Sequence, residues 1–406
     1  MTDEPDRISA IFGQHDNATL AQLRDVASRA ERAALMADGH VGYVMPIGGV
    51  AAYRNQASVV GVGFDIACGN AAIRTDLHGD DFDRPQWSAL ADAIAATVSF
   101  GIGRRNESSD APVEHPLFES ASWDAVPRAE RDALKRRARE QLGTVGSGNH
   151  YVDVFADEAG AIWVGVHFGS RGFGHTVASG FLSLAVGKSW GVRVPEREVL
   201  LDLDAPIGHD YWHLMQLAGE YAYAGREWVA RKVVSILGGR ELDLVHNHHN
   251  FAWKETHDGE ELIVVRKGAT PAFPGQKSFV GGSMGDDSVI LEGASEDLDL
   301  QRKALFSTVH GAGRVMSRTE ARGKRKGWGP RARIVSPGKV SWEMLDSWLA
   351  EKGVIRRGGG LDESPHAYRR LPDVLEAQGN TIRVVHRLTP IIVIMAGENE
   401  FDPYTD

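Results

Sequence analysis

Short apolar runs that end in a glycine turn with a polar residue recur along most of the chain, and they restrict the fold more than any other feature. Examples are the stretches around Asp65 and Cys68 and around His150, while His249 adjoins Asn250 in a comparable turn. Polar groups beside glycines at strand ends are typical of sites built on a rigid sheet. These turns extend from residue 38 to residue 395, without an internal repeat or a Pro- or Ser-rich linker. We therefore predict one interwoven domain, residues 1–406.

Hydrophobic periodicity divides the chain into helices and strands. Helical spacing of apolar residues predicts helices over residues 17–36, 86–100, 128–142, 209–238, 299–309, 341–352 and 371–378. Alternating or continuous apolar runs predict strands over Tyr43–Ile47, Val59–Val62, 151–157, 161–169, the stretches that begin near 243 and 261, and two final strands in TIRVVHRL and IIVIM.

Two of these strands are expected to form a hairpin. The runs 151–157 and 161–169 are joined by the turn-forming sequence DEAGA. His150 begins one strand and His167 lies near the end of the other. Antiparallel pairing would therefore bring both histidines to the same edge of a sheet.

The composition excludes several classes of protein. With 42% apolar residues the chain can bury a core, so it is not a disordered chain, and a net charge of −10 does not indicate a nucleic-acid binder. A basic stretch from Arg314 to Lys339 nevertheless follows a glycine turn around His310. This stretch is either a solvated face or a surface that attracts a polyanion.

The cysteine content, the first residues and the length of the last apolar run indicate where in the cell the protein is found. The single cysteine, Cys68, rules out an intrachain disulfide, and the first residues lack the basic start and apolar core of a signal peptide. The apolar run 387–397 is too short to cross a bilayer and is expected to be a buried strand. We therefore expect a cytoplasmic protein without membrane association.

One carboxylate, one thiol and three imidazoles form a candidate metal-ligand set: Asp65, Cys68, His150, His167 and His249. Such a mixed set suits Mn²⁺, Zn²⁺, Co²⁺ or Fe²⁺, whereas a lone Mg²⁺ site prefers oxygen ligands. The spacing matches neither a zinc finger nor the HExxH pattern. Each histidine can instead be a core or surface residue, and Cys68 a small buried apolar side chain.

The turn His310-Gly311-Ala312-Gly313-Arg314 is a candidate phosphate site. Glycines allow close approach of the backbone to a ligand, and the pattern predicts a helix whose N-terminus would face an anion. His310 would then be a nucleophile held inside a phosphate cradle. The alternative is a packed, hydrogen-bonded turn residue.

Several motifs, taken in order, resemble the RtcB-type RNA ligases, which are GTP- and manganese-dependent enzymes of tRNA splicing and RNA repair. The matching pieces are GVGFDIACG (61–69), GTVGSGNH (143–150), HFGSRGFGH (167–175), HHNFAWKE (248–255), RKGAT (266–270), GGSMG (281–285), STVHGAGRVMSR (307–318) and DESPHAY (362–368). The resemblance implies an α+β fold in which central antiparallel sheets line a metal cleft and helices surround them.

The resemblance also implies roles for individual residues. Cys68 would bridge two Mn²⁺ ions, with Asp65 and His150 completing one site and His167 and His249 the other. His310 would be the nucleophile that carries GMP, and Arg171 would face RNA phosphate. The residues implied to hold the guanine nucleotide are Asn149, Asn250, Ser283, Ser288, Gly311, Gly313, Arg314 and Tyr368.

The implied activity is ligation of an RNA 3′-phosphate or 2′,3′-cyclic phosphate end to a 5′-hydroxyl end, with GTP as the energy source. An archease-like protein is an implied activator. Two alternatives stay open: a nucleic-acid 3′-phosphate capping enzyme or metal phosphoesterase on the same site, and a noncatalytic RNA-binding paralogue.

Some positions depart from the family pattern. Met395 stands where a lysine usually contacts the nucleotide, Asp153 replaces a glutamate, and Phe168 replaces a small residue. A methionine cannot supply the charged contact of a lysine. These departures indicate a divergent paralogue.

Overall fold

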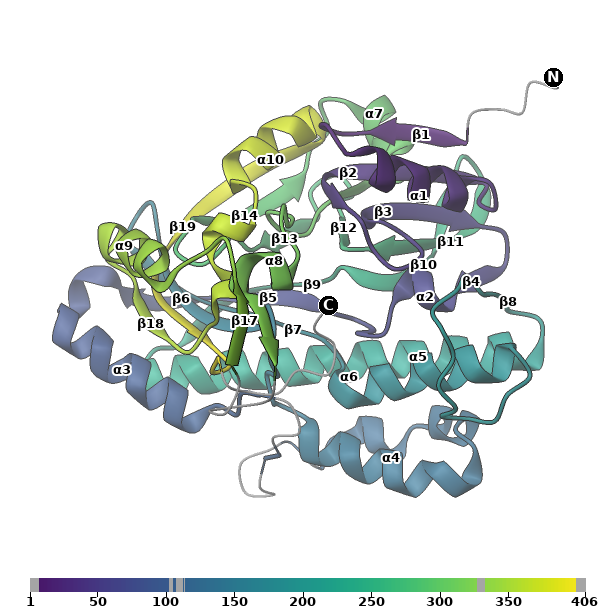
Figure 1. Cartoon of the computed structure of the whole chain (residues 1–406), viewed down its shortest axis with the longest axis horizontal. Coiled ribbons are helices and arrows are strands. Elements are labelled where there is room, and N and C mark those ends of the chain that lie inside the picture. Colours follow the sequence, from purple (N-terminus) through teal and green to yellow (C-terminus); the bar gives the residue numbers. More distant parts are fainter. Residues whose placement is uncertain (1–6, 102–104, 107–111, 113, 327–332, 399–406) are drawn as a thin grey trace.

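The structure of the chain is a computed structural model that describes residues 7–101, 105–106, 112, 114–326 and 333–398. Helices and strands are mixed within these residues, and nearly all strand pairs are antiparallel. The expected α+β class, with antiparallel sheets surrounded by helices, is confirmed (Figure 1). None of the helices described is both long and apolar enough to cross a membrane.

The central sheet has the strand order β13-β14-β19-β6-β7-β5-β9, and each neighbouring pair along it is antiparallel. Its strands are β5 (Gly69–His78), β6 (Tyr151–Asp157), β7 (Ala161–Phe168), β9 (Glu241–His248), β13 (Lys277–Val280), β14 (Ser288–Gly293) and β19 (Ile382–Met395). The short strand β18 (Ile355–Arg357) pairs in parallel with β19.

The two outer strands of this order, β13 and β9, are bridged by side chains. The N–H of Phe279 donates to Asn247 Oδ1 at 3.1 Å, and Asn70 Nδ2 donates to the Phe279 carbonyl at 2.9 Å. The central sheet is therefore nearly closed. Its register brings Gly69 opposite both Phe168 and His248, so the turns that adjoin three strands meet at one end.

A second sheet, in the order β1-β2-β3-β11-β10, lies beside that end. Its strands are β1 (Ile8–Ile11), β2 (Arg32–His40), β3 (Ile47–Tyr53), β10 (Asn250–His257) and β11 (Glu260–Lys267). Three strand pairs complete the sheets: β4 (Gln56–Ser58) with β8 (Leu200–Asp202), β12 (Ala269–Pro271) with β15 (Ser307–Val309), and β16 (Gly323–Lys326) with β17 (Arg333–Pro337).

Helices cover the sheets: α6 lies against β5 and β7 of the central one, and α5 lies beside α6 (Figure 1). The α-helices are α1 (Asn17–Ala27), α2 (Val59–Val62), α3 (Arg84–Thr97), α4 (Arg128–Gln141), α5 (Arg171–Ala185), α6 (Pro206–Leu237), α7 (Leu298–Lys303), α8 (Arg318–Arg322), α9 (Trp342–Lys352) and α10 (Leu371–Gln378). Short 3₁₀ turns cover Gly79–Asp81, Pro116–Glu119, Ala121–Ala125, Leu361–Glu363, Pro365–Ala367 and Gly379–Thr381.

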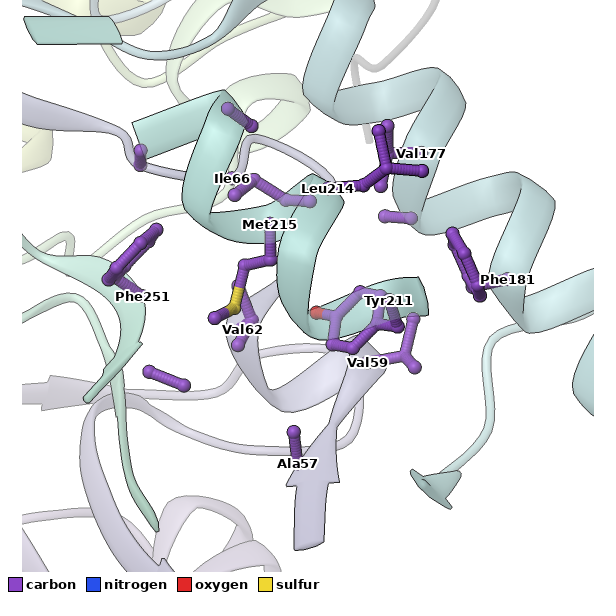
Figure 2. Packing of buried hydrophobic residues seen from close by; sticks show 14 of the residues in the cluster. Ala57, Val59, Val62, Ile66, Val177, Phe181, Tyr211, Leu214, Met215 and Phe251 are labelled. Atoms are coloured by element: carbon purple, nitrogen blue, oxygen red, sulfur yellow. The ribbon is translucent and has the colours of Figure 1, made fainter. Parts of the chain in front are cut away.

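The largest core forms around α6, whose apolar face is buried along most of its 32 residues. Tyr211, Leu214 and Met215 of α6 pack toward Val59 and Val62 of α2, as Figure 2 shows. Figure 2 also shows Phe251, Val177 and Phe181 in this cluster. Since α2 leads directly into the turn that carries Asp65 and Cys68, this packing fixes the base of that turn.

Several predicted elements are confirmed. The hairpin of β6 and β7 forms as expected, with Tyr151 opposite His167. Helices α3, α4, α6, α9 and α10 lie close to their predicted ranges.

Other predicted elements were wrong, mainly where an apolar run fits two structures. The helix predicted over 17–36 ends at Ala27, and Arg32–His40 forms strand β2, which is buried on both faces. Val59–Val62 is a helix capped by Ser58, and Tyr43–Ile47 is mostly loop. The predicted helix 299–309 is divided into α7 and β15, while the two predicted final strands are the single strand β19.

Candidate active site

The five predicted metal ligands come together at the end of the central sheet. Asp65 and Cys68 lie in the turn between α2 and β5, His150 precedes β6, His167 lies in β7, and His249 joins β9 to β10. The ligand atoms of Asp65, Cys68 and His150 lie within 4.8 Å of one another, as do those of Cys68, His167 and His249. Cys68 belongs to both groups, so its sulfur is common to two candidate metal sites.

The orientation of the imidazoles supports this interpretation. His150 Nδ1 lies 2.8 Å from the Val145 carbonyl and His167 Nδ1 lies 3.1 Å from the Asn149 carbonyl. A carbonyl accepts, so each Nδ1 donates and each Nε2 keeps its lone pair. The Nε2 atom of His150 lies 3.7 Å from Cys68 Sγ, and that of His167 lies 3.3 Å from it. His249 Nδ1 is buried and has no hydrogen-bond partner among the described residues. A bound metal ion would satisfy that nitrogen.

The pKa shifts of the ligands follow from their burial. Burial raises the pKa of the Cys68 thiol well above its usual value, so an isolated thiolate would be unfavourable here. Burial lowers the pKa values of His167 and His249 well below the usual range, so both rings are neutral at pH 7. Neutral imidazoles and a thiolate that needs positive charge are the donor set of a transition-metal site.

A buried arginine that was not predicted joins the ligand-bearing segments. Arg226 of α6 is fully buried, and its guanidinium donates to the Ala67 carbonyl at 2.9 Å and the Phe168 carbonyl at 2.6 Å. It also donates to His248 Nδ1 at 2.8 Å and to His246 Nε2 at 2.9 Å. Ala67, Phe168 and His248 each adjoin a predicted ligand, so one guanidinium holds three ligand segments together.

Lys267 is a second buried cation near the ligands. Its ammonium fills the space beside Gly63, where an added Cβ would lie 1.8 Å from Nζ and where φ is +97°. Burial lowers the pKa of Lys267 to about 8, and Asp65 and Cys68 oppose that shift. Gly63 is therefore required both for the turn and for the room it leaves to Lys267.

His310 is held by a buried aspartate that lay outside the predicted site residues. Asp38 Oδ2 lies 2.6 Å from His310 Nδ1 and accepts from the backbone N–H of His310 at 3.0 Å and of Gly311 at 3.3 Å. A carboxylate so placed keeps the proton on Nδ1 and leaves Nε2 with a lone pair. The centroid of the His310 ring lies 4.9 Å from that of His249.

The helix predicted to begin at the His310 turn is wrong. No helix begins at the turn, because residues 311–317 are irregular and α8 starts only at Arg318. The first N–H groups after the strand are directed to Asp38. Gly313, with φ of +74°, is required because an added Cβ would lie 2.4 Å from the Asp38 carbonyl oxygen.

A cavity of about 270 Å³ extends from the ligand cluster past His310. Most of the predicted nucleotide-binding residues line it: Asn149, Asn250, Ser283, Gly311, Gly313, Arg314 and Tyr368. Ser288 does not line the cavity, and its hydroxyl instead accepts from the Gly282 N–H at 3.0 Å. Ser288 therefore shapes the glycine loop that forms one wall.

One end of the cavity is formed by β6 and β19, with Tyr151 next to the predicted ligand His167. Their register places Asp153 opposite Val393 and Tyr151 opposite Met395, and all four residues line the cavity. Among the described residues, Asp153 Oδ1 and the Tyr151 hydroxyl have no hydrogen-bond partner. Burial raises the pKa of the Asp153 carboxyl well above its usual value. This end offers two polar atoms on an otherwise apolar wall.

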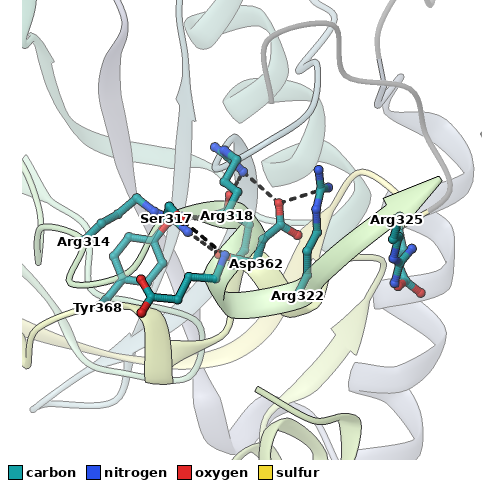
Figure 3. A network of polar contacts seen from close by, with 10 residues as sticks. Arg314, Ser317, Arg318, Arg322, Arg325, Asp362 and Tyr368 are labelled. Atoms are coloured by element: carbon teal, nitrogen blue, oxygen red, sulfur yellow. Dashed lines mark hydrogen bonds and ion pairs between the residues drawn. The ribbon is translucent and has the colours of Figure 1, made fainter. Parts of the chain in front are cut away.

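The basic stretch after His310 is largely paired within the protein (Figure 3). Arg318 forms ion pairs with Asp362 and Glu363, and Arg322 lies 3.5 Å from Asp362. Arg314 donates to the Tyr368 hydroxyl at 2.8 Å and pairs with Glu363. Arg314, Arg318 and Arg322 therefore stiffen the cavity wall, and carboxylates of the protein offset their charges. Arg331, also in the stretch, lies outside the described residues.

Arg171 begins α5 beside the ligand cluster and does not line the cavity. Its φ of 58° is unusual for a residue with a side chain, and its Nη1 lies 3.4 Å from His150 Nδ1. The guanidinium packs against Gly146, where an added Cβ would lie 2.2 Å away. A local backbone distortion of this kind is common at functional sites.

Comparison with known proteins assigns the family. A family model described as tRNA-splicing ligase RtcB matches residues 18–396. The tRNA-splicing ligase RtcB of Archaeoglobus fulgidus is 32% identical, covering 88% of this chain and 86% of that protein. The protein of that name from Pyrobaculum aerophilum is 33% identical over 89% of this chain and 87% of its own, and the RNA-splicing ligase RtcB of Escherichia coli is 29% identical over 89% of each. The chain belongs to the RtcB family.

Proposed function

We propose that the protein is an RNA ligase that joins RNA 3′-phosphate or 2′,3′-cyclic phosphate ends to 5′-hydroxyl ends through a His310–GMP intermediate. Its role would be in RNA repair or tRNA splicing. The single observation that carries this proposal is the Asp38–His310 pair, which shares one cavity with the predicted metal ligands and the nucleotide-binding residues. The names of the related proteins support the same reaction class.

His310 has the arrangement of an activated nucleophile. Its Nδ1–H donates to Asp38, which leaves the Nε2 lone pair to attack the α-phosphorus of GTP. A P–N bond forms, the bond to the bridging oxygen breaks, and pyrophosphate leaves. Asp38 then stabilises the positive charge that develops on the ring.

The later steps regenerate His310. The GMP group passes to the RNA 3′-phosphate as a P–O bond forms and the His310–phosphorus bond breaks. The oxygen of the 5′-hydroxyl end then attacks the activated phosphorus, and GMP leaves. A 2′,3′-cyclic phosphate must first be opened by water to the 3′-phosphate.

Two Mn²⁺ ions would suit the ligand cluster: Asp65, Cys68 and His150 would hold one, and Cys68, His167 and His249 would hold the other. When bound, such ions stabilise charge on phosphoryl oxygens as Lewis acids. The ligands supply negative charge only through Asp65 and Cys68, while Arg226 and Lys267 add buried positive charge nearby. The loaded site is therefore positively charged overall, which suits a triphosphate and an RNA phosphate.

The cavity wall provides for the guanine nucleotide. Tyr368 would lie against the base, and Asn149, Asn250, Ser283, Gly311, Gly313 and Arg314 would contact the rest of the nucleotide. Asp153 would accept from the guanine N–H groups, while Met395 on the same wall provides only apolar contact. Ser288 acts indirectly, through Gly282. Arg171 would contact RNA phosphate outside the cavity.

The proposal is tested by intact-mass measurement after incubation with GTP and Mn²⁺. Addition of one GMP is expected in the wild-type protein and no addition in His310→Ala, which should keep its metal ions. Labelled RNA strands with a 3′-phosphate and a 5′-hydroxyl should then be joined. An unlabelled His310 under every divalent metal tried would exclude this route.

Met395 supports a second candidate function for the same site. An apolar side chain at a position where relatives usually have a lysine changes the contact to the nucleotide. A capped or hydrolysed 3′ end without a joined strand would identify a nucleic-acid 3′-phosphate capping enzyme or a metal phosphoesterase. Tight RNA binding without turnover, with activity restored by Met395→Lys, would identify a noncatalytic paralogue.

Two further expectations accompany the proposal. We expect a cytoplasmic location, since the Cys68 thiolate must remain reduced to bind metal. We also expect an archease-like activator to raise the rate of GMP transfer to His310, which a rate measurement with and without that protein would show.

A further inference from the structure

A row of three aromatic rings lies beside the ligand cluster. The ring centroids of Tyr43 and Phe64 are 6.4 Å apart and their planes are nearly perpendicular, at 88°. The centroids of Phe64 and His175 are 5.5 Å apart, at 36°. The rings come from three separate segments: the loop between β2 and β3, the ligand turn, and α5.

This row adjoins Asp65, the most exposed member of the ligand set. Phe64 directly precedes Asp65, whose side chain is 32% exposed, whereas that of His150 is only 9% exposed. Cys68, His167 and His249 are all buried. His175 follows Arg171 by one turn of α5, so a cation lies on the same face of that helix.

The outermost ring is held in an exposed position. Tyr43 is 55% exposed, which is unusual for so large a side chain. Its loop is fixed to α1, because the Gln22 side chain donates to the Gly42 carbonyl at 2.6 Å and accepts from the Gly42 N–H at 3.0 Å. Gly42 is needed there, since an added Cβ would lie 2.2 Å from the Met45 carbonyl oxygen.

We propose that Tyr43, Phe64 and His175 form a stacking platform for unpaired RNA bases next to the end being joined. The proposal rests on the proposed RNA ligase function and names how the substrate is held. Aromatic side chains beside a cation are the usual means of binding single-stranded nucleic acid, because every base has a face that stacks. The platform adjoins both the proposed metal site and Arg171, so a strand with its terminal phosphate at the metals would pass over these rings.

The test measures binding and joining of a short single-stranded RNA with a 3′-phosphate by the metal-loaded full-length protein. Tyr43→Ala is expected to raise the Kd by about tenfold, in line with the loss of one base stack. Tyr43→Phe and Tyr43→Trp should bind as well as wild type. Leu242→Ala is the matched control, because Leu242 is 60% exposed and lies about 20 Å along β9 from the site.

RNAs with a single abasic position near the joining end identify the stacked base. With the wild-type protein, an abasic site at one position should weaken RNA binding about as much as Tyr43→Ala does. Tyr43→Ala combined with that abasic RNA should bind only slightly more weakly than either change alone. Equal weakening by Tyr43→Ala of intact and abasic RNA at all positions would overturn the proposal. The proposal would also be overturned if Tyr43→Ala bound RNA as tightly as wild type but no longer bound an activator protein.

Transfer of GMP to His310 separates this proposal from the proposed function. Tyr43→Ala should accept GMP from GTP at the wild-type rate, because Tyr43 does not line the nucleotide cavity. If wild type accepts no GMP while Tyr43→Ala and one abasic position still have non-additive effects on RNA binding, that result would support the platform and contradict the ligase proposal.

Discussion

At the scale of single residues, the site depends on buried polar groups that act through their neighbours. Asp38 is fully buried and has three contacts to the His310 turn. Arg226 is also fully buried, and no carboxylate of the described residues lies within ion-pair distance of it. Burial lowers the pKa of Arg226 to about 10, and the guanidinium stays charged at pH 7. All described hydrogen bonds of Arg226 go to carbonyls and imidazoles. The ligand segments therefore determine the orientation of its guanidinium.

Asp38→Asn is expected to slow transfer of GMP to His310 on the order of a hundredfold or more. An amide cannot stabilise the charged imidazole and can favour the wrong tautomer, as in other histidines oriented by a carboxylate. The rate of labelling with radioactive GTP measures the effect. Metal content should match wild type, and an unchanged rate would show that Asp38 serves only the turn.

Arg226→Lys is expected to weaken Mn²⁺ binding by about 10- to 100-fold, the usual effect of losing a group that orients metal ligands. A lysine keeps the charge but cannot make four hydrogen bonds in the plane of a guanidinium. Titration with Co²⁺, followed by its thiolate absorption band, measures both affinity and ligand geometry. Arg231→Lys, at an exposed ion pair on the same helix, is the control; equal effects of the two variants would refute a positioning role for Arg226.

At the scale of elements, sequence patterns correctly predicted the structures that depend on residues close together in the chain. The β6–β7 hairpin could be predicted because its turn and alternation lie within one stretch, and it placed His150 and His167 together. The partner of His310 could not, since Asp38 lies 272 residues away in the chain. Residues 32–36 could not be assigned by periodicity either, because a strand buried on both faces has the same continuous apolar pattern as a buried helix.

A buried ion pair connects the second sheet to the strand that precedes His310. Arg266 of β11 pairs with Glu255 of β10 and also donates to Ser307 Oγ at 2.8 Å and to the Leu305 carbonyl at 2.9 Å. Burial alone raises the pKa of the Glu255 carboxyl, but Arg266 and His257 outweigh burial and hold that pKa below its usual 4.5. The pair's contribution to stability is therefore complete above pH 4.5 and is lost as the pH falls below it.

Glu255→Gln should accordingly destabilise the protein by about 3 kcal/mol at pH 7, since it leaves the charge of Arg266 buried without its partner. Melting temperatures of both proteins across pH 3 to 7 test this, and the gap between them should narrow below about pH 4.5. Glu260→Gln removes an exposed partner of Arg54 in the same sheet and should change little. A gap that stays constant with pH would contradict the assignment.

At the scale of the whole molecule, the site is assembled from most of the chain. The predicted ligands run from Asp65 to His249, the proposed nucleophile is His310, and the cavity reaches Met395. The motifs identified the cluster, but its geometry depends on sheet order, which no local pattern encodes. The total charge of −10 was likewise a poor guide to function, because the buried cations lie at one end of the central sheet.

Removal of metal should therefore lower the melting temperature of the whole protein in one transition. A single ion present at roughly a hundred times its Kd contributes about 3 kcal/mol to the folded state. Calorimetry with and without a chelator measures this effect. Cys68→Ala should lose both ions and show no chelator effect; retention of two ions in that variant would contradict the bridging role of Cys68.

The near-closure of the central sheet has a consequence for behaviour at high protein concentration. Unpaired strand edges act as templates for strands of other chains and lead to aggregation. Here the Asn247 side chain accepts the Phe279 N–H and the Asn70 side chain donates to the Phe279 carbonyl, so groups of β13 that would face a foreign strand are already occupied. Two asparagine amides thus protect the sheet from intermolecular pairing at the seam where its own ladder is incomplete.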